Sequence, residues 1–186
     1  MEKELDALGR NPSYEDLAKL PYTLAVFKEA MRLYPPAYMV ARRAIEDVAI
    51  GEHFVKKGAI CFISVIGIHR RPEVFADPER FDPTRFLDDR EKQLPRCGYL
   101  PFGAGPRICI GNHFALMEGH VLLATIARQA RFDALSPNAK VELEPLVTLR
   151  PKNGLPMSVA TRPWSQSGVA KGVAGALDSS ATAALP

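Results

Sequence analysis

The amino-acid sequence predicts an α+β protein that is mainly α-helical, with small β-sheets and a disordered tail. Segments 21–34 and 110–129 carry apolar residues at the three- and four-residue spacing of an amphipathic helix. Between them, residues 47–63 break into short runs separated by glycines, as the strands of a small sheet do. Residues 164–186 are mostly Ala, Gly and Ser, so they carry too little apolar bulk to offset the entropy of ordering.

The first helices have recognisable starts and stops. Residues 2–8 resemble the last turns of a helix that Gly9 ends. The run 13–16 has the form of a capping box at the start of a short helix. The helix over 21–34 stops at Pro35-Pro36, because proline has no backbone donor and disfavours helix in the residue before it. Its predicted apolar face consists of Leu24, Phe27 and Met31.

The rest of the chain alternates between regular and irregular segments. Short strands are expected at 47–50, 53–56 and 59–63. Residues 71–101 are rich in Pro, Asp and Arg and show no period, which in a compact domain suggests a functional segment. Short strands joined by loops are expected over 131–160. The helix over 110–129 is expected to present on one side Phe114, Met117, Val121 and Leu122.

Composition and charge exclude several classes of protein. The chain has 186 residues, of which 47% are hydrophobic and 24% charged, as in soluble globular proteins. A net charge of +3 without any run of five Lys or Arg gives no support for nucleic-acid binding. Residues 1–6 do not form a signal peptide, and the apolar stretch Ile60–Ile68 is too short to span a bilayer. No membrane association is indicated in this segment.

The chain has three cysteines, Cys61, Cys97 and Cys109. An odd number with no Cys-x-x-Cys pair argues against a disulfide framework and against a zinc knuckle. A reducing compartment fits best, and we expect the protein in the cytoplasm.

The glycine-rich loop 101–111 precedes a helix and is the most informative stretch. Such a loop often binds phosphate, but here Ile108 stands where the third glycine of a dinucleotide-binding motif belongs, and no Gly-Lys-Ser/Thr follows. A lone cysteine is often buried and inert. Cys109, however, is predicted at a helix N-terminus, where the helix dipole favours a thiolate.

The same loop resembles the haem-binding signature Phe-x-x-Gly-x-Arg-x-Cys-x-Gly of the cytochrome P450 family. The resemblance implies that Cys109 is the axial thiolate of haem b, and therefore its metal ligand. It also implies that Arg107 binds a haem propionate and that Phe102 packs near the sulfur. The matching or adjacent glycines, which let backbone approach a flat ligand, are Gly103, Gly105 and Gly111.

Further segments resemble other parts of the family. An arginine just before the small sheet reaches a propionate in the family, and the register to Asp47 favours Arg42 over Arg43. Glu29 and Arg32 before a Leu-Tyr-Pro-Pro run resemble the family's K helix, whose buried pair is completed by an arginine downstream.

Two arginines compete for that third position in the structural triad. Arg80 lies in Pro-Glu-Arg-Phe, as in the family. Arg85 satisfies the wider pattern Phe-x-Pro-x-Arg-Phe, and the upstream copy has Ala76 where the first Phe belongs. We therefore expect Arg85 to be the third member, beside Glu29 and Arg32.

The resemblance implies a domain organisation and an activity. Residues 1–163 correspond to the C-terminal, haem-binding half of the P450 fold: K helix, small sheet, meander, Cys loop, L helix and C-terminal strands. Residues 164–186 are the tail. The implied activity is that of a monooxygenase, which inserts one oxygen atom from O2 into an apolar small molecule with electrons from a ferredoxin or flavoprotein reductase.

The family's distal, oxygen-activating helix has no counterpart in these 186 residues. We therefore expect this chain alone to be inactive, and a truncated gene, a wrong start or a split protein would each explain its length. The alternative function is a truncated, non-catalytic remnant. The substrate and the type of redox partner do not follow from the sequence.

Overall fold

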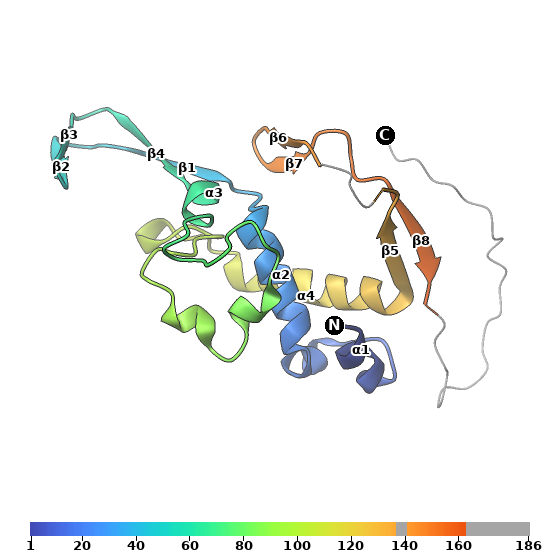
Figure 1. Cartoon of the computed structure of the whole chain (residues 1–186). Helices are drawn as coiled ribbons and strands as arrows, with labels where there is room; N and C mark the ends of the chain where they lie inside the picture. The colour runs from blue at the N-terminus through green and yellow to red at the C-terminus, as the bar shows by residue number, and fades with distance from the viewer. Residues whose placement is uncertain (137–140, 163–186) are drawn as a thin grey trace.

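The structure is a computed structural model that describes residues 1–136 and 141–162. The predicted disordered tail therefore lies outside the described residues. The described part consists of helices and short two-stranded antiparallel sheets, in agreement with the predicted α+β class (Figure 1). The helical elements are α1 (Glu2–Leu8), η1 (Tyr14–Lys19), α2 (Pro21–Leu33), α3 (Val65–Ile68), η2 (Pro83–Phe86), η3 (Arg90–Gln93), η4 (Gly105–Arg107) and α4 (Asn112–Gln129), where η marks a 3₁₀ helix. The strands are β1 (Met39–Arg43), β2 (Val48–Ile50), β3 (His53–Val55), β4 (Ile60–Ser64), β5 (Ala130–Ala134), β6 (Leu143–Pro145), β7 (Leu149–Pro151) and β8 (Met157–Thr161).

Helix α2 begins at a cap that another helix provides. Pro21 occupies its first turn, where a missing N–H costs nothing. The Glu4 carboxylate, from α1, accepts hydrogen bonds from the backbone N–H groups of Tyr22 and Thr23 at 2.7 and 2.9 Å. A carboxylate is favoured there because the first N–H groups of a helix lack intrahelical partners and carry partial positive charge. This capping ties α1 to the start of α2.

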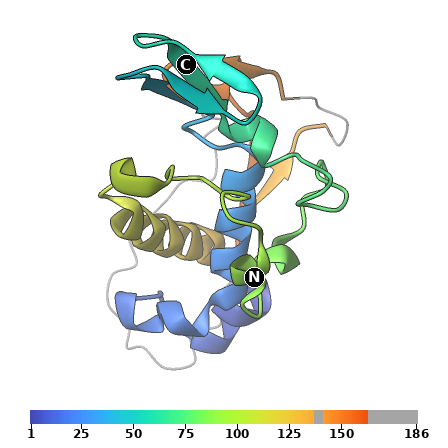
Figure 2. The ribbon, with the colours of Figure 1, turned by 90° about the vertical axis from the view of Figure 1, so that its left-hand side faces the viewer.

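Helix α4 crosses α2 and also covers α1 (Figures 1 and 2). Leu5 and Leu20 are fully buried against Ala124 and Ala127 in one core cluster. Two buried polar side chains of α4 reach backbone carbonyls of the N-terminal segment. His120 Nε2 donates to Leu20 O at 3.0 Å, and Arg128 Nη1 donates to Leu5 O at 2.6 Å. Buried polar groups that are hydrogen-bonded in this way fix the register between helices.

The crossing of α2 and α4 is close at Gly119. A Cβ atom added at Gly119 would lie 2.6 Å from Phe27 Cε1, closer than carbon atoms approach without strain. The Phe27 ring thus lies on the backbone of α4, and glycine leaves the room that this requires.

We expect Gly119→Ala to lower the free energy of unfolding by about 1–3 kcal/mol, the usual range for overpacking. Urea denaturation followed by circular dichroism measures this change. Glu118→Ala, at an exposed neighbour on the same helix, is the matched control and should have little effect. Adding Phe27→Leu should recover part of the loss, and equal losses with and without Phe27 would contradict the packing.

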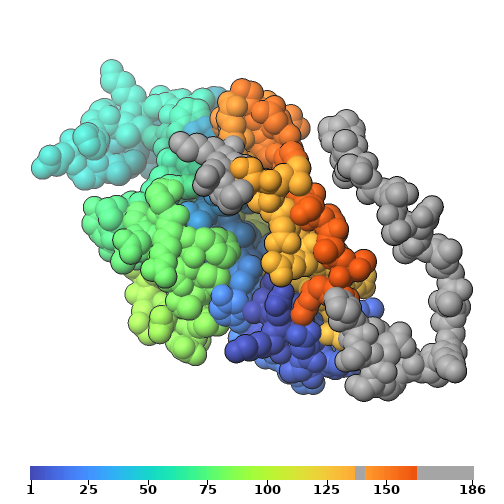
Figure 3. Space-filling model, turned by 45° about the vertical axis from the view of Figure 1, so that its right-hand side comes forward, coloured from blue at the N-terminus to red at the C-terminus, as the bar shows by residue number. Residues whose placement is uncertain are grey.

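Four antiparallel strand pairs make up the sheets: β1 with β4, β2 with β3, β5 with β8, and β6 with β7. The β1–β4 pair continues the chain from one end of α2, whereas α1 lies at the other end (Figure 2). The β2–β3 hairpin projects away from the helices (Figures 1 and 3). Its large apolar side chains are exposed: Val48, Ile50 and Phe54.

Three sequence predictions about local structure were wrong in detail. The strand β1 was not predicted, and it contains Arg42, which pairs with Cys61 instead of preceding the sheet. Residues 71–101 are not without structure, because η2 and η3 lie within them. Both η2 and β1 are too short to show a period in the sequence.

The third correction concerns α4. The helix begins at Asn112 instead of Ile110, so Cys109 lies in the turn before the helix. The residues of α4 that are buried are His120, Ala124, Ala127 and Arg128, whereas Phe114 and Leu122 of the predicted apolar face are exposed. The small side chains of Ala124 and Ala127 allow α4 to approach α1 and α2, whereas Phe114 and Leu122 remain at the surface.

Candidate functional site

The centre of the molecule holds a buried ion pair on α2. Glu29 and Arg32 are both fully buried and lie one helical turn apart. Arg32 Nε donates to Glu29 Oε2 at 2.7 Å, and Arg32 Nη2 donates to Glu29 Oε1 at 2.8 Å. Such a two-pronged pair suits the planar guanidinium and would not form with lysine. The same carboxylate also accepts the backbone N–H of Asp82 at 2.8 Å.

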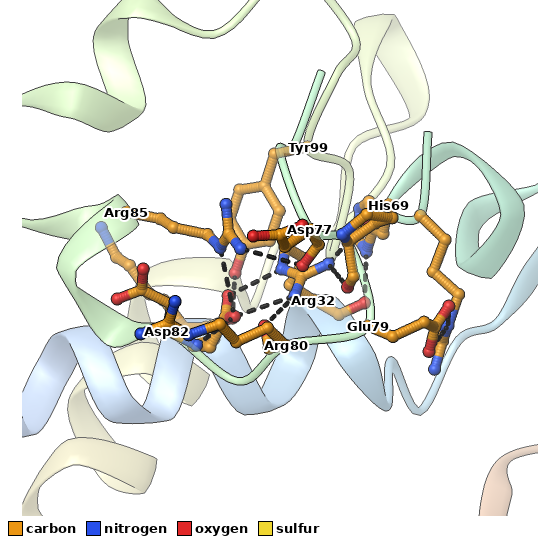
Figure 4. A network of polar contacts seen from close by, with 12 residues as sticks. Arg32, His69, Asp77, Glu79, Arg80, Asp82, Arg85 and Tyr99 are labelled. Atoms are coloured by element: carbon orange, nitrogen blue, oxygen red, sulfur yellow. Dashed lines mark hydrogen bonds and ion pairs between the residues drawn. The ribbon is translucent and has the colours of Figure 1, made fainter. Parts of the chain in front are cut away.

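The remaining donors of Arg32 hold the irregular segment that follows the sheet (Figure 4). Nη1 donates to the carbonyls of His69 and Pro78 at 2.8 and 2.7 Å, and Nη2 donates to Arg80 O at 3.1 Å. All five N–H groups of the guanidinium therefore have acceptors. Its face lies over the Phe75 ring, with 5.0 Å from Cζ to the ring centroid. One buried side chain thus anchors three carbonyls of residues 69–80 to α2.

The two competing arginines contact this pair differently. Arg85 Nε lies 3.5 Å from Glu29 Oε1, in a side chain that is 14% exposed, and Arg85 Nη2 donates to Asp77 O at 3.1 Å. Arg80 contributes its backbone carbonyl to Arg32, and its own residue is exposed. The structure therefore brings Glu29, Arg32 and Arg85 together and leaves the Arg80 guanidinium outside the pair.

A buried histidine links the same network to the segment before the Cys loop. The side chain of His69 is fully buried, with an exposed fraction of 0%. His69 Nδ1 lies 3.2 Å from Arg32 O, and the backbone N–H of Leu100 donates to His69 Nε2 at 2.7 Å. Burial lowers the pKa of His69 from its ordinary 6.5 to about 4, and the nearby charges of Arg32 and Arg70 act in the same direction. The imidazole is therefore neutral at pH 7.

This lowered pKa predicts how stability depends on pH. The unfolded chain binds a proton on His69 below about pH 6.5, whereas the folded chain does so only below about pH 4. The stabilisation by the neutral form is therefore complete above pH 6.5 and is lost as the pH falls from 6.5 to 4. We expect the midpoint of urea denaturation to fall over this window. His69→Gln should flatten that part of the profile, and an unchanged profile would contradict the assignment.

The Cys loop, residues 101–111, follows Leu100 and includes η4. Gly103 and Gly105 have φ angles of 73° and 74°, a left-handed conformation that favours glycine. The loop is closed by a hydrogen bond from Cys109 N to Phe102 O at 3.0 Å. Cys109 itself is exposed. A Cβ atom added at Gly111 would lie 3.9 Å from Cys109 Sγ, so the sulfur lies beside this glycine.

The surface near Cys109 fits a flat, apolar ligand that contains a metal. Ile108, Ile110 and Phe114 are exposed, with Ile110 wholly so. No atom lies within 4 Å of a Cβ built at Gly103 or Gly105, so the backbone there is open. Arg107 is exposed, and within the described residues no carboxylate pairs with its guanidinium. Thiol, apolar side chains and a free cation are the groups that haem iron, porphyrin and propionate need.

The other candidate residues lie apart from this loop. Arg42 is exposed in β1, and its guanidinium donates to Ala41 O at 2.8 Å. Cys61 is half-buried in β4, and Cys97 is exposed with a φ of 64°. Within residues 1–136 and 141–162, no group of three His, Cys, Asp or Glu side chains is arranged to hold a metal ion.

The sequence reasoning missed the connecting role of His69. No motif signals the bond from Leu100 to His69, because the two residues are 31 positions apart. Only the fold brings them together.

Comparison with known proteins identifies the family. The model of the family described as Cytochrome P450 matches residues 1–156. The chain belongs to the cytochrome P450 family, whose fold implies haem with a cysteine thiolate ligand. The resemblance that the Cys loop indicated is thereby confirmed.

Relatives with named activities occur in bacteria and animals. The chain is 45% identical over 130 residues to cyclooctat-9-en-7-ol 5-monooxygenase of Streptomyces melanosporofaciens, covering 69% of this chain and 28% of that protein. It is 36% identical over 162 residues to the ultra-long-chain fatty acid omega-hydroxylase of Homo sapiens, covering 87% and 30%. The chain thus spans about a third of the length of the curated relatives it matches.

Solved structures show the same fold. A cytochrome P450 crystal structure aligns with a TM-score of 0.76 and 31% identity, over 87% of this chain and 37% of that one. The heme domain of cytochrome P450DA, as a mutant, aligns with a TM-score of 0.79, over 90% and 37%, and at 24% identity shows the fold alone. In the described part of this chain, no helix has the length and apolarity needed to cross a membrane.

Proposed function

We propose that this chain forms the haem-binding part of a cytochrome P450 monooxygenase, in which the Cys109 sulfur would bind the haem iron. The observation that carries the proposal is the exposed Cys109 thiol in a glycine-rich loop, with exposed apolar side chains and the exposed Arg107 close to it in the chain. When bound, haem b supplies the redox chemistry that inserts one oxygen atom of O2 into a substrate, and a thiolate ligand favours O–O cleavage.

The residues of the chain would share the task of holding that group. Cys109 would bind through its sulfur, and Gly103, Gly105 and Gly111 would let the backbone lie close to the porphyrin. Arg107 would bind a propionate through its guanidinium, and we assign the same role to Arg42. Phe102 would hold the loop through its carbonyl bond to Cys109 N. Glu29, Arg32 and Arg85 would maintain the structure from which the loop extends.

The substrate and the electron donor follow at the level of chemical class. Relatives named for cyclooctat-9-en-7-ol and for ultra-long-chain fatty acids support an apolar small molecule as the substrate. A ferredoxin or a flavoprotein reductase would donate electrons. The exposed Arg96 near the Cys loop would attract an acidic partner of this kind. Arg107 lies in the same part of the chain, but its guanidinium would be occupied by the propionate.

A chimera tests the proposal. In a completed domain, this chain replaces the aligned segment of the Streptomyces monooxygenase named above. We expect the completed domain to bind haem and, with a redox partner and ¹⁸O2, to form a product that contains one ¹⁸O atom. Cys109→Ser should abolish that product. Product that persists without Cys109 would contradict the proposal.

The chain of 186 residues by itself is expected to form no product under the same conditions. Cys109 and Arg107 offer one face for haem and one propionate contact, whereas oxygen activation requires a site that excludes water on both faces. Product formation by the 186-residue chain that depends on Cys109 would contradict this expectation.

A further inference from the structure

Two hydrogen bonds fix the protonation of the buried His69. The partner of Nε2 is the backbone N–H of Leu100, which is a donor, so Nε2 must be the acceptor. The proton of the neutral ring therefore lies on Nδ1 and is donated to Arg32 O at 3.2 Å. In the other direction, Arg32 Nη1 donates to His69 O at 2.8 Å. The side chain of each residue therefore donates a hydrogen bond to the backbone carbonyl of the other.

The neighbour of Leu100 is held in the same place. The Tyr99 hydroxyl donates to Lys28 O at 2.9 Å, so it reaches α2 one residue before Glu29. The Tyr99 ring lies 5.0 Å from the His69 ring and 4.8 Å from the Phe86 ring, measured between centroids. Two consecutive residues, Tyr99 and Leu100, are therefore fastened to the buried network just before the Cys loop begins.

From Leu100, hydrogen bonds lead on to the cysteine. Gly103 N donates to Leu100 O at 3.1 Å, and Cys109 N donates to Phe102 O at 3.0 Å. These two backbone hydrogen bonds connect residues that are three and seven positions apart. The position of the loop therefore depends on the position of Leu100. No other side chain in the described residues donates to or accepts from the backbone of residues 100–109 in this way.

We propose that His69 is a positioning residue for the iron ligand: its Nε2, by accepting the Leu100 N–H, sets where the Cys109 loop leaves the buried Glu29–Arg32 pair. The idea that Cys109 binds iron rests on the proposed function. The statement about where the loop lies does not, because it concerns contacts within this chain.

Two substitutions separate the two hydrogen bonds of His69. In His69→Gln, the amide reaches the place of Nε2 and keeps an acceptor for Leu100. In His69→Asn, the shorter amide reaches the place of Nδ1 and keeps a donor for Arg32 O, but leaves Leu100 without an acceptor. His120→Asn is the matched control, because His120 is also buried and bonds to a backbone carbonyl, Leu20 O, away from the loop.

The first readout uses the full 186-residue chain without haem. We expect His69→Asn to speed hydrogen exchange at the Leu100 amide by about tenfold, as the loss of one hydrogen bond implies. The rate at which Cys109 reacts with a thiol reagent should also change in His69→Asn. His69→Gln should remain near the wild-type values in both measurements, and His120→Asn should lower only the thermal stability. If His69→Asn and His69→Gln had equal effects, or if the hydrogen exchange rate of the Leu100 amide were unchanged in His69→Asn, the proposal would be overturned.

The second readout is the ferrous carbonyl spectrum of the completed domain. We expect His69→Asn to lower the fraction of haem in the red-shifted, thiolate-ligated form, and His69→Gln to restore it. If each of the three variants lost the red-shifted form in proportion to its loss of stability, the role of His69 would be structural only, and the proposal would be overturned. If the wild type itself lacked the red-shifted form, the proposed function would fail, whereas the exchange data would still decide the position of the loop.

Discussion

Glu29→Ala is expected to lower the free energy of unfolding by about 3–5 kcal/mol, enough to prevent folding of a marginally stable domain. The substitution leaves the fully buried Arg32 guanidinium without its carboxylate, and it also removes the acceptor of Asp82 N. Arg32→Ala should cost as much, because three backbone carbonyls lose their donors with it. Guanidinium chloride denaturation of the purified chain, followed by circular dichroism, measures both losses.

The downstream arginines provide the control for this expectation. Arg85→Ala should be clearly destabilising, since its guanidinium lies 3.5 Å from Glu29 and bonds to Asp77 O. Arg80→Ala should be mild, because Arg80 contributes only a backbone carbonyl, which alanine retains. The reverse order, in which Arg80→Ala lowers the free energy of unfolding more than Arg85→Ala does, would contradict the assignment of Arg85 to the triad.

Cys109→His is expected to abolish the red-shifted Soret band of the ferrous carbonyl form in the completed domain. A thiolate ligand donates more charge to the iron than an imidazole does, and the red shift reports that donation. Cys61→Ser and Cys97→Ser are the controls and should retain the band. Both cysteines lie outside the Cys loop, Cys61 in β4 and Cys97 at a backbone turn.

A red-shifted band that survives Cys109→His would show that another sulfur ligates the iron. A band lost in Cys61→Ser would point to the sheet instead of the loop. Either result would remove the assignment on which the proposed function depends.

Local signals in the sequence predicted much of the fold. Pro35-Pro36 ended α2 close to Leu33, and Gly9 ended α1 in a left-handed conformation with a φ of 65°. The α+β class and the family are confirmed, the latter because the signature of the Cys loop is specific. Prolines, glycines and a dense motif act over a few residues, so they are readable without the tertiary structure.

What depends on distant contacts was not predictable in the same way. The buried side of α4 is set by how closely it approaches α1 and α2, so Ala124 and Ala127 are buried in place of Phe114 and Leu122. The strand β1 forms because β4 is there to pair with it. The Leu100–His69 bond joins two segments that no periodicity relates.

The sequence did single out Glu29 and Arg32 as a pair, but not the extent of their contacts. A Glu-x-x-Arg spacing usually gives an exposed pair worth a few tenths of a kcal/mol. Here both side chains are fully buried, and Arg32 also bonds to the carbonyls of His69, Pro78 and Arg80. Burial of this kind depends on the segment that folds over α2, and that segment has no regular pattern.

Iron X-ray absorption of the haem-loaded completed domain would identify the ligand of the iron. We expect one sulfur scatterer in the first coordination shell of the iron, in addition to the porphyrin nitrogens. This sulfur should disappear in Cys109→Ser and remain in a Cys61→Ser, Cys97→Ser double variant. A first shell of nitrogen and oxygen alone in the wild type, or a sulfur that persists in Cys109→Ser, would contradict the assignment of Cys109 as the ligand.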